Sequence, residues 1–311
     1  MTKSSYFFEL ELVRYLISAF AIPLCVLLIY TVVKHRRNQV FQSPFFILLT
    51  VMSTLDLLAC VKTVTFDLWM RQMGGWSVFP DGINISLAIG YITWYGALVG
   101  VLAIAANRFV VVFWPIRYQQ IWTPCVTRVM VALQLLVGIV YTSLMLHPRF
   151  QMRLISDTEF HLKHHNDSAA RTYHASMLVL DLLAAPVLLL IYSILGVRLC
   201  LRERRLPHIR SSSGSCVQQH QVMITHMKLT LTGFILSTFI ICASVLFMGI
   251  YCQMLHAATF MPWYLLAIAF NHASSPLIAF GMSSALREAA WTTLRSCGTN
   301  MNTADNAQFE I

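Results

Sequence analysis

The sequence predicts an all-α membrane protein, a seven-transmembrane helix bundle with a short amphipathic helix after the seventh span. Hydrophobic residues make up 57% of the 311 residues and charged residues only 11%, whereas about a quarter of a soluble domain is charged. The apolar residues occur in runs near the length of about 20 residues that a helix needs to cross a bilayer. Because too few polar side chains remain to cover a water-exposed surface, we expect the chain to lie in a membrane.

Seven spans can be placed along the chain, and we expect them at residues 12–33, 44–66, 83–113, 126–147, 173–199, 225–251 and 260–282. Residues 283–295 carry apolar side chains at helical spacing and predict a helix that lies on the membrane surface. No internal repeat is visible, so residues 1–311 are expected to form a single domain.

The distribution of basic residues predicts the orientation. The net charge is +9, and Lys and Arg are about twice as frequent in the segments of one side as in those of the other. This asymmetry predicts a multi-pass plasma-membrane protein with its N-terminus outside and its C-terminus in the cytoplasm. Asn166 lies in an Asn-x-Ser sequon of the loop after the fourth span, on the predicted outer face, and is a candidate glycosylation site. No nucleic-acid motif accompanies the positive charge, so membrane lipid is the expected partner and nucleic acid is not.

The inner end of the third predicted helix carries the most informative motif. Asn107, Arg108 and Phe109 are followed by Pro115 and Tyr118. This segment resembles the corresponding end of helix 3 in rhodopsin-like receptors, where Asp-Arg-Tyr leads after five residues into Pro-x-x-Tyr. The resemblance implies that Arg108 contacts the receptor's own helix 6 at rest and a heterotrimeric G protein when active. The alternative is an arginine that merely extends to the cytoplasmic interface. Asn107 replaces the family's acid, so the usual neighbouring ion pair is missing.

The seventh predicted helix resembles the family's Asn-x-x-x-Asn-Pro-x-x-Tyr segment. Asn271 and Pro276 are kept, whereas Ser275 and Ala279 replace the second Asn and the Tyr. Because Pro276 removes a backbone donor, the helix can kink differently in two states. Asp56 resembles the acid of helix 2 in these receptors, and Asn271 is its expected partner. A structural polar contact between helices is the alternative role for Asp56, and it does not exclude a functional one.

Taken over the whole chain, the Asn-Arg-Phe motif and the altered seventh helix resemble the nematode serpentine chemoreceptors, most of all class V of the superfamily that includes class G. The resemblance implies a G-protein-coupled chemosensory receptor with a small-molecule ligand, and it adds the cilium of a sensory neuron as a candidate location. Cys297, just beyond the surface helix, is a candidate for palmitoylation, and a free cytoplasmic thiol is the alternative.

A ligand pocket is expected in the outer half of the bundle. The candidate pocket residues are Lys62, Tyr91, Trp94, Tyr95, Asp181, Trp263 and Tyr264. The three aromatic residues of the third span share one helix face. Aromatic stripes often serve packing, and Trp263 and Tyr264 also fit an interfacial belt. Asp181 and Lys62 are stronger indications of a functional site, because unpaired charges at membrane depth are costly.

Other functional classes are less well supported by the sequence. A transporter or channel is the main alternative, but neither pseudo-repeats nor a ring of pore charges is apparent. An enzyme would need clustered polar residues at one depth, and a retinal protein would need a lysine in the seventh span. His161, His164 and His165 could suggest a metal site, but their surroundings indicate a solvated polar loop. No metal, cofactor or catalytic residue is therefore predicted.

Overall fold

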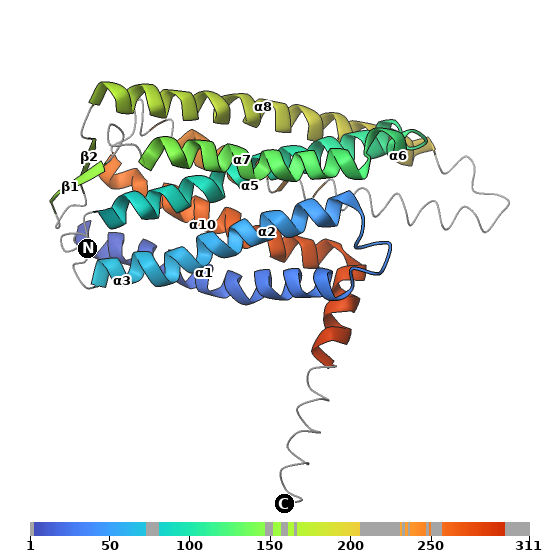
Figure 1. The fold of residues 1–311 in the computed structure, drawn as a ribbon, viewed down its shortest axis with the longest axis horizontal. Helices are drawn as coiled ribbons and strands as arrows, with labels where there is room; N and C mark the ends of the chain where they lie inside the picture. Colours follow the sequence, from blue (N-terminus) through green and yellow to red (C-terminus); the bar gives the residue numbers. More distant parts are fainter. Residues whose placement is uncertain are drawn as a thin grey trace, which may run out of the picture.

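The computed structural model describes residues 3–72, 81–146, 152–156, 161–164, 167–205, 231, 234–235, 237–246, 249 and 257–295. Long helices run side by side in a bundle, with the short strands β1 and β2 at the end where the N-terminus lies (Figure 1). Within the described part, six helices are long and apolar enough to cross a membrane. The expected span at 225–251 is described mainly as the apolar helix Ser237–Leu246.

The helices correspond to the predicted spans, and several extend beyond them. They are α1 (Lys3–Lys34), α2 (Pro44–Lys62), α3 (Leu68–Gln72), α5 (Asp81–Phe113), α6 (Tyr118–Ile121), α7 (Pro124–Leu146), α8 (Asp167–Arg205) and α10 (Ala257–Met282). A π-helical turn, η1 (Thr63–Asp67), joins α2 to α3, so the second span continues past the predicted end at residue 66. Large apolar side chains on the outside of the bundle, such as Leu183, Leu190 and Val197 on α8, form the surface expected to face lipid.

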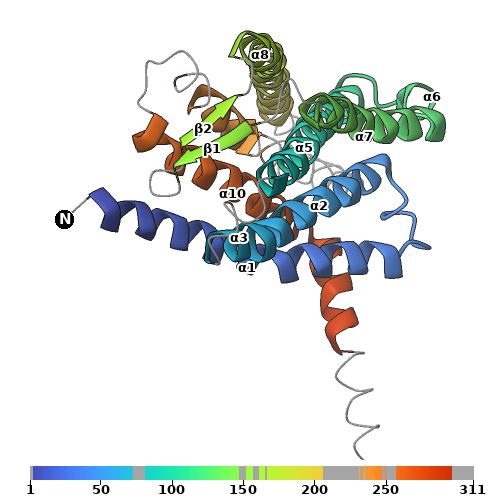
Figure 2. The same cartoon turned by 60° about the vertical axis from the view of Figure 1, so that its left-hand side comes forward.

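Helix α5 lies at the centre of the bundle, where it packs against α2, α7 and α8 (Figure 2). Small residues permit the closest of these contacts. A Cβ atom at Gly138 of α7 would come within 2.6 Å of the backbone oxygen of Ile92, and one at Gly96 of α5 within 2.5 Å of Leu55. Because association between membrane helices depends on close packing, these glycines set how near α2, α5 and α7 can approach.

Two smaller elements complete the described fold. β1 (Met152–Ser156) pairs antiparallel with β2 (His161–His164), so the loop after the fourth span contains a hairpin that the sequence analysis did not predict. The helix at 284–295 follows α10, as expected, and leaves the bundle at an angle (Figure 1). Leu286 on its inner face is fully buried, whereas Trp291 and Leu294 are exposed. That distribution is the amphipathic pattern of a helix at a membrane surface.

Candidate functional site

The C-terminal end of α5 holds Arg108 inside the bundle. The residue is 7% exposed, and its guanidinium carbon lies 4.0 Å from the centre of the Phe45 ring on α2. Phe109, the next residue, stacks on Phe113 at 4.5 Å between ring centres. No acidic side chain among the residues described forms an ion pair with Arg108. An arginine packed on an aromatic ring is held by cation–π attraction, and this geometry differs from that of a side chain extended to the interface.

Asn107 ties α5 to the turn that follows it. Its side-chain amide donates a hydrogen bond of 2.9 Å to the hydroxyl of Tyr118, at the start of α6. Pro115 lies in the connection between the two helices, where it restricts the backbone. Asn107 and Tyr118 therefore join two parts of the predicted motif through a neutral contact, where the receptors that the motif resembles have an acid beside the arginine.

A second polar contact lies deep in the bundle, between α2 and α10. The Asp56 carboxylate oxygen Oδ1 and the His272 ring nitrogen Nδ1 are 2.7 Å apart, and both residues are buried. The expectation that Asn271 would be the partner of Asp56 was wrong, because the contact comes from the adjacent residue. Pro276 lacks the N–H that would bond to the carbonyl of His272 four residues earlier. Helix α10 is therefore weakened at the residue that binds Asp56.

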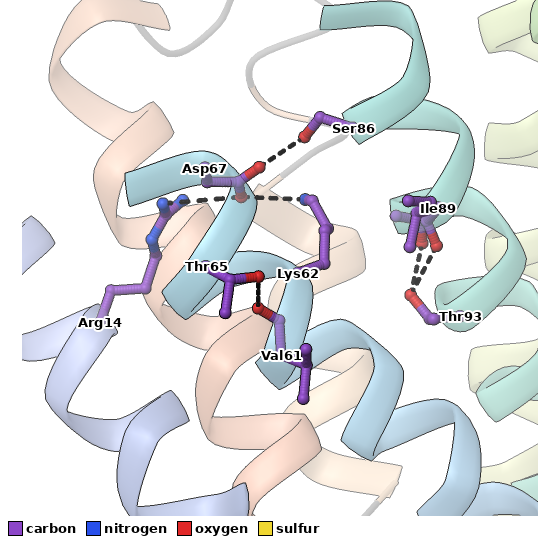
Figure 3. A network of polar contacts seen from close by, with 9 residues as sticks. Arg14, Val61, Lys62, Thr65, Asp67, Ser86, Ile89 and Thr93 are labelled. Atoms are coloured by element: carbon purple, nitrogen blue, oxygen red, sulfur yellow. Dashed lines mark hydrogen bonds and ion pairs between the residues drawn. The ribbon is translucent and has the colours of Figure 1, made fainter. Parts of the chain in front are cut away.

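Toward the end of the bundle where the N-terminus lies, Asp67 is the centre of a network that joins α1, the second span and α5 (Figure 3). Its Oδ2 atom lies 3.0 Å from Lys62 Nζ and 3.9 Å from Arg14 Nη2. Its Oδ1 atom accepts a hydrogen bond of 2.7 Å from the hydroxyl of Ser86. The side chains of Lys62 and Asp67 are only 16% and 10% exposed. Both oxygens of this buried carboxylate are thus engaged by charged or polar donors.

A different carboxylate, Asp181 on α8, is surrounded by aromatic side chains. It is 4% exposed, and the indole N–H of Trp94 donates to its Oδ1 atom over 3.4 Å. The neighbouring Tyr95 ring stacks on Tyr141 of α7 with 4.5 Å between ring centres. Tyr264 of α10 also lies close enough to interact electrostatically with Asp181. Four helices, α5, α7, α8 and α10, therefore contribute to this cluster.

Comparison with known proteins agrees with this architecture. The family model described as "Serpentine type 7TM GPCR chemoreceptor Srv" matches residues 14–295. The chain belongs to the Srv family of serpentine chemoreceptors. A curated relative, "Serpentine receptor class V-1" of Caenorhabditis elegans, is 25% identical over 206 residues, which cover 61% of this chain and 63% of the relative. The chain thus matches less than two thirds of that relative's length.

The family assignment confirms the predicted resemblance to class V receptors and the seven-transmembrane fold. This Srv protein is a multi-pass membrane protein. Its family is one of receptors and is not a class of enzymes.

The candidate pocket residues fall into two groups in this Srv protein. Tyr91, Trp94, Tyr95, Asp181 and Tyr264 lie together, with Tyr91 stacked on Tyr95 at 6.3 Å. Lys62 belongs to the Asp67 network, so it is not the unpaired charge that the sequence suggested. Trp263 is 40% exposed, as an interfacial residue would be, although it neighbours the half-buried Tyr264. Asn166, His165 and Cys297 lie outside the described residues, as do the side chains of the two other loop histidines.

Sequence reasoning missed Arg14, Asp67 and Ser86. The sequence did indicate Arg14 and Asp67, because each is a charged residue within or next to an apolar run. The pairing of Lys62 with Asp67 was harder to predict from the sequence. In an α-helix, residues five apart point about 140° away from each other, whereas the π-helical turn brings Asp67 back over Lys62.

Proposed function

We propose that this protein is a G-protein-coupled chemosensory receptor, formed as one domain over residues 1–311. It binds a small molecule among the aromatic residues around Asp181 and activates a heterotrimeric G protein at the opposite end of the bundle. The family match and the presence of two separate polar sites, around Asp181 and around Arg108, support this function.

The single observation that carries the proposal is that one helix contributes to both sites. Near its middle, helix α5 carries Trp94, which bonds to Asp181, and the neighbouring Tyr95; close to its C-terminal end it carries Asn107 and Arg108. Fourteen residues separate Trp94 from Arg108, which corresponds to about 21 Å along a helix. A rotation or shift of α5 caused by ligand binding would also move Arg108, because a helix moves as a rigid element.

The switch in this proposal consists of Asn107, Arg108, Phe109, Pro115 and Tyr118 at the inner end. Arg108 rests against Phe45 in the structure and would turn toward an acceptor on the G protein when the bundle opens. A neutral hydrogen bond to Tyr118, in place of an ion pair, leaves the resting state only weakly held.

The deeper contact allows the two ends to communicate. Asp56 and His272 connect α2 to α10 at the point where Pro276 weakens the helix. A change of kink in α10 would alter this contact, and Asn271 lies beside it. In this proposal, the contact between Asp56 and His272 forms a second part of the switch, at the centre of the bundle.

The orientation follows the basic residues. The N-terminus, the Asp181 cluster and Asn166 are placed outside, with Asn166 carrying a glycan, and Arg108, the helix at 284–295 and Cys297 face the cytoplasm. Palmitoylation of Cys297 would anchor the surface helix to lipid. The plasma membrane, including that of a sensory cilium, is the corresponding location.

The decisive experiment measures GTP turnover by heterotrimeric G proteins with the purified protein in lipid nanodiscs, over a panel of volatile and water-soluble small molecules. We expect at least one compound to increase turnover. Arg108→Ala should abolish the increase without loss of ligand binding, because the two sites lie about 21 Å apart along α5. Arg128→Ala, which removes an exposed arginine from the same end of the bundle, is the matched control and should signal normally. Ligand-driven solute flux in proteoliposomes, without GTP turnover, would instead identify a transporter or channel.

A further inference from the structure

Asp181 is a buried carboxylate whose charge is not balanced within the described part of the protein. The indole N–H of Trp94, at 3.4 Å, is a long and neutral donor. No Lys, Arg or His side chain among the residues described forms an ion pair with Asp181. An isolated carboxylate in a membrane interior is costly unless a positive charge or a proton accompanies it.

Two cations described in the half of the bundle that contains the N-terminus pair with a different carboxylate. Lys62 and Arg14 both interact with Asp67, and Lys62 does so at 3.0 Å. On the α5 side, Gly90 faces this network, since a Cβ atom there would lie 3.9 Å from Lys62 Nζ. The side chains described around Asp181 therefore differ in kind from those around Asp67: they are aromatic and uncharged.

Aromatic side chains surround Asp181 from three other helices. Trp94 and Tyr95 come from α5, Tyr141 from α7 and Tyr264 from α10, and all four interact with the carboxylate or with one another. The faces of aromatic rings attract cations, most strongly in sites from which water is excluded. A buried carboxylate within such surroundings offers an organic ammonium group an anionic partner and several electron-rich rings.

We propose that the Asp181 cluster binds the positively charged amino group of the ligand, so that this receptor senses organic amines or quaternary ammonium compounds. The inference rests on the proposed function as a small-molecule receptor and names the ligand class. The ligand's ammonium group supplies a charge that the side chains described around Asp181 do not. No cationic side chain in the described surroundings is available to pair with an acid group of the ligand, so simple amines fit better than zwitterions.

The test uses three ammonium probes, namely choline, tetramethylammonium and benzyltrimethylammonium, on the purified full-length protein in nanodiscs. The neutral control is the analogue of choline in which a tert-butyl group replaces the trimethylammonium group, since it has the same shape without the charge. Thermal stabilisation at millimolar concentrations reports binding. We expect at least one ammonium probe to raise the melting temperature and the neutral analogue to leave it unchanged.

Variants connect the effect to the cluster. Asp181→Asn should weaken binding of the effective probe about a hundredfold, since it removes the charge partner of a desolvated ion pair. Trp94→Phe, which keeps an aromatic ring but removes the N–H group, should change binding less than tenfold. Tyr264→Ala should weaken binding by removing an aromatic surface. Thr65→Val, which removes an exposed hydroxyl that bonds to the local carbonyl of Val61, is the control and should retain binding.

Two outcomes would overturn the proposal. One is that no ammonium probe stabilises the wild-type protein or that the neutral analogue does so equally well, a comparison that requires no variant to fold. The other is that Asp181→Asn binds the effective probe as tightly as the wild type. Ammonium binding without GTP turnover would support this inference and contradict G-protein activation, so the two proposals fail separately.

Discussion

Asp67 and Asp181 are both buried carboxylates, but their surroundings are opposite in character. Asp67 is engaged by Lys62, Arg14 and Ser86, and it links three helices (Figure 3). Asp181 is surrounded by aromatic rings and receives one long hydrogen bond from Trp94. We therefore expect Asp67 to hold the fold together, whereas the role proposed for Asp181 is to pair with a charge on a ligand. Burial of an acid alone does not distinguish the two roles; its partners do.

The largest expected effect is on the stability of the Asp67 network. Asp67→Asn should lower the free energy of unfolding by about 3–5 kcal/mol, because it leaves two buried cations without their carboxylate. Asp181→Asn should change stability by less than about 1 kcal/mol or increase it, since no cation among the residues that the structure describes loses a partner. Thermal unfolding in nanodiscs measures both. Equal destabilisation by the two substitutions would contradict the distinction between them.

A double-mutant cycle sharpens the same comparison. The double variant with Lys62→Met and Asp67→Asn should lose about 2–3 kcal/mol less stability than the two single variants lose in sum. The reason is that the second substitution removes a charge that the first left unpaired. Thr65→Val, in the same π-helical turn, is the control, since the Thr65 hydroxyl bonds only to the local carbonyl of Val61 among the contacts seen (Figure 3). If the stability losses of the two single variants simply add in the double variant, the 3.0 Å contact between Lys62 and Asp67 contributes little to stability.

A third buried acid extends the comparison to the centre of the membrane. His272→Ala should destabilise the protein by about 2 kcal/mol, because it removes the hydrogen-bond partner of Asp56. Asn271→Ala should have a smaller effect on the Asp56 contact. Basal GTP turnover should also change in the His272 variant if the pair is part of the switch. Unaltered turnover with lowered stability would assign the pair a structural role only.

The smallest effect concerns the neutral contact at the inner end. Tyr118→Phe removes the hydroxyl that accepts from Asn107 and should cost about 1 kcal/mol. Asn107→Asp should lower basal GTP turnover, since a carboxylate beside Arg108 adds a charge-assisted contact to the resting state. Raised or unchanged turnover in Asn107→Asp would contradict the idea that the resting state is weakly held.

The sequence was most informative where a property depends on residues that are adjacent in the chain. The lengths of the apolar runs predicted the spans, and the spacing from Arg108 to Tyr118 predicted a motif whose ends are now seen in contact through Asn107. Asp181 and its aromatic neighbours were also found as candidates, because polar and aromatic residues stand out within apolar helices. Helix ends were less accurate, since α1 and α8 continue beyond their most apolar parts.

The partners of the buried charges were decided by the tertiary structure. The partner of Asp56 is His272 and not Asn271, and Tyr264 packs against the core while Trp263 is exposed. In both cases neighbouring residues on a helix differ by about 100° in direction, so the choice depends on how each helix is rotated against the others. That rotation is set by packing between helices, such as the close contacts at Gly96 and Gly138. The sequence by itself therefore determined which residues are available within the membrane, and only the folded bundle determined which of them meet.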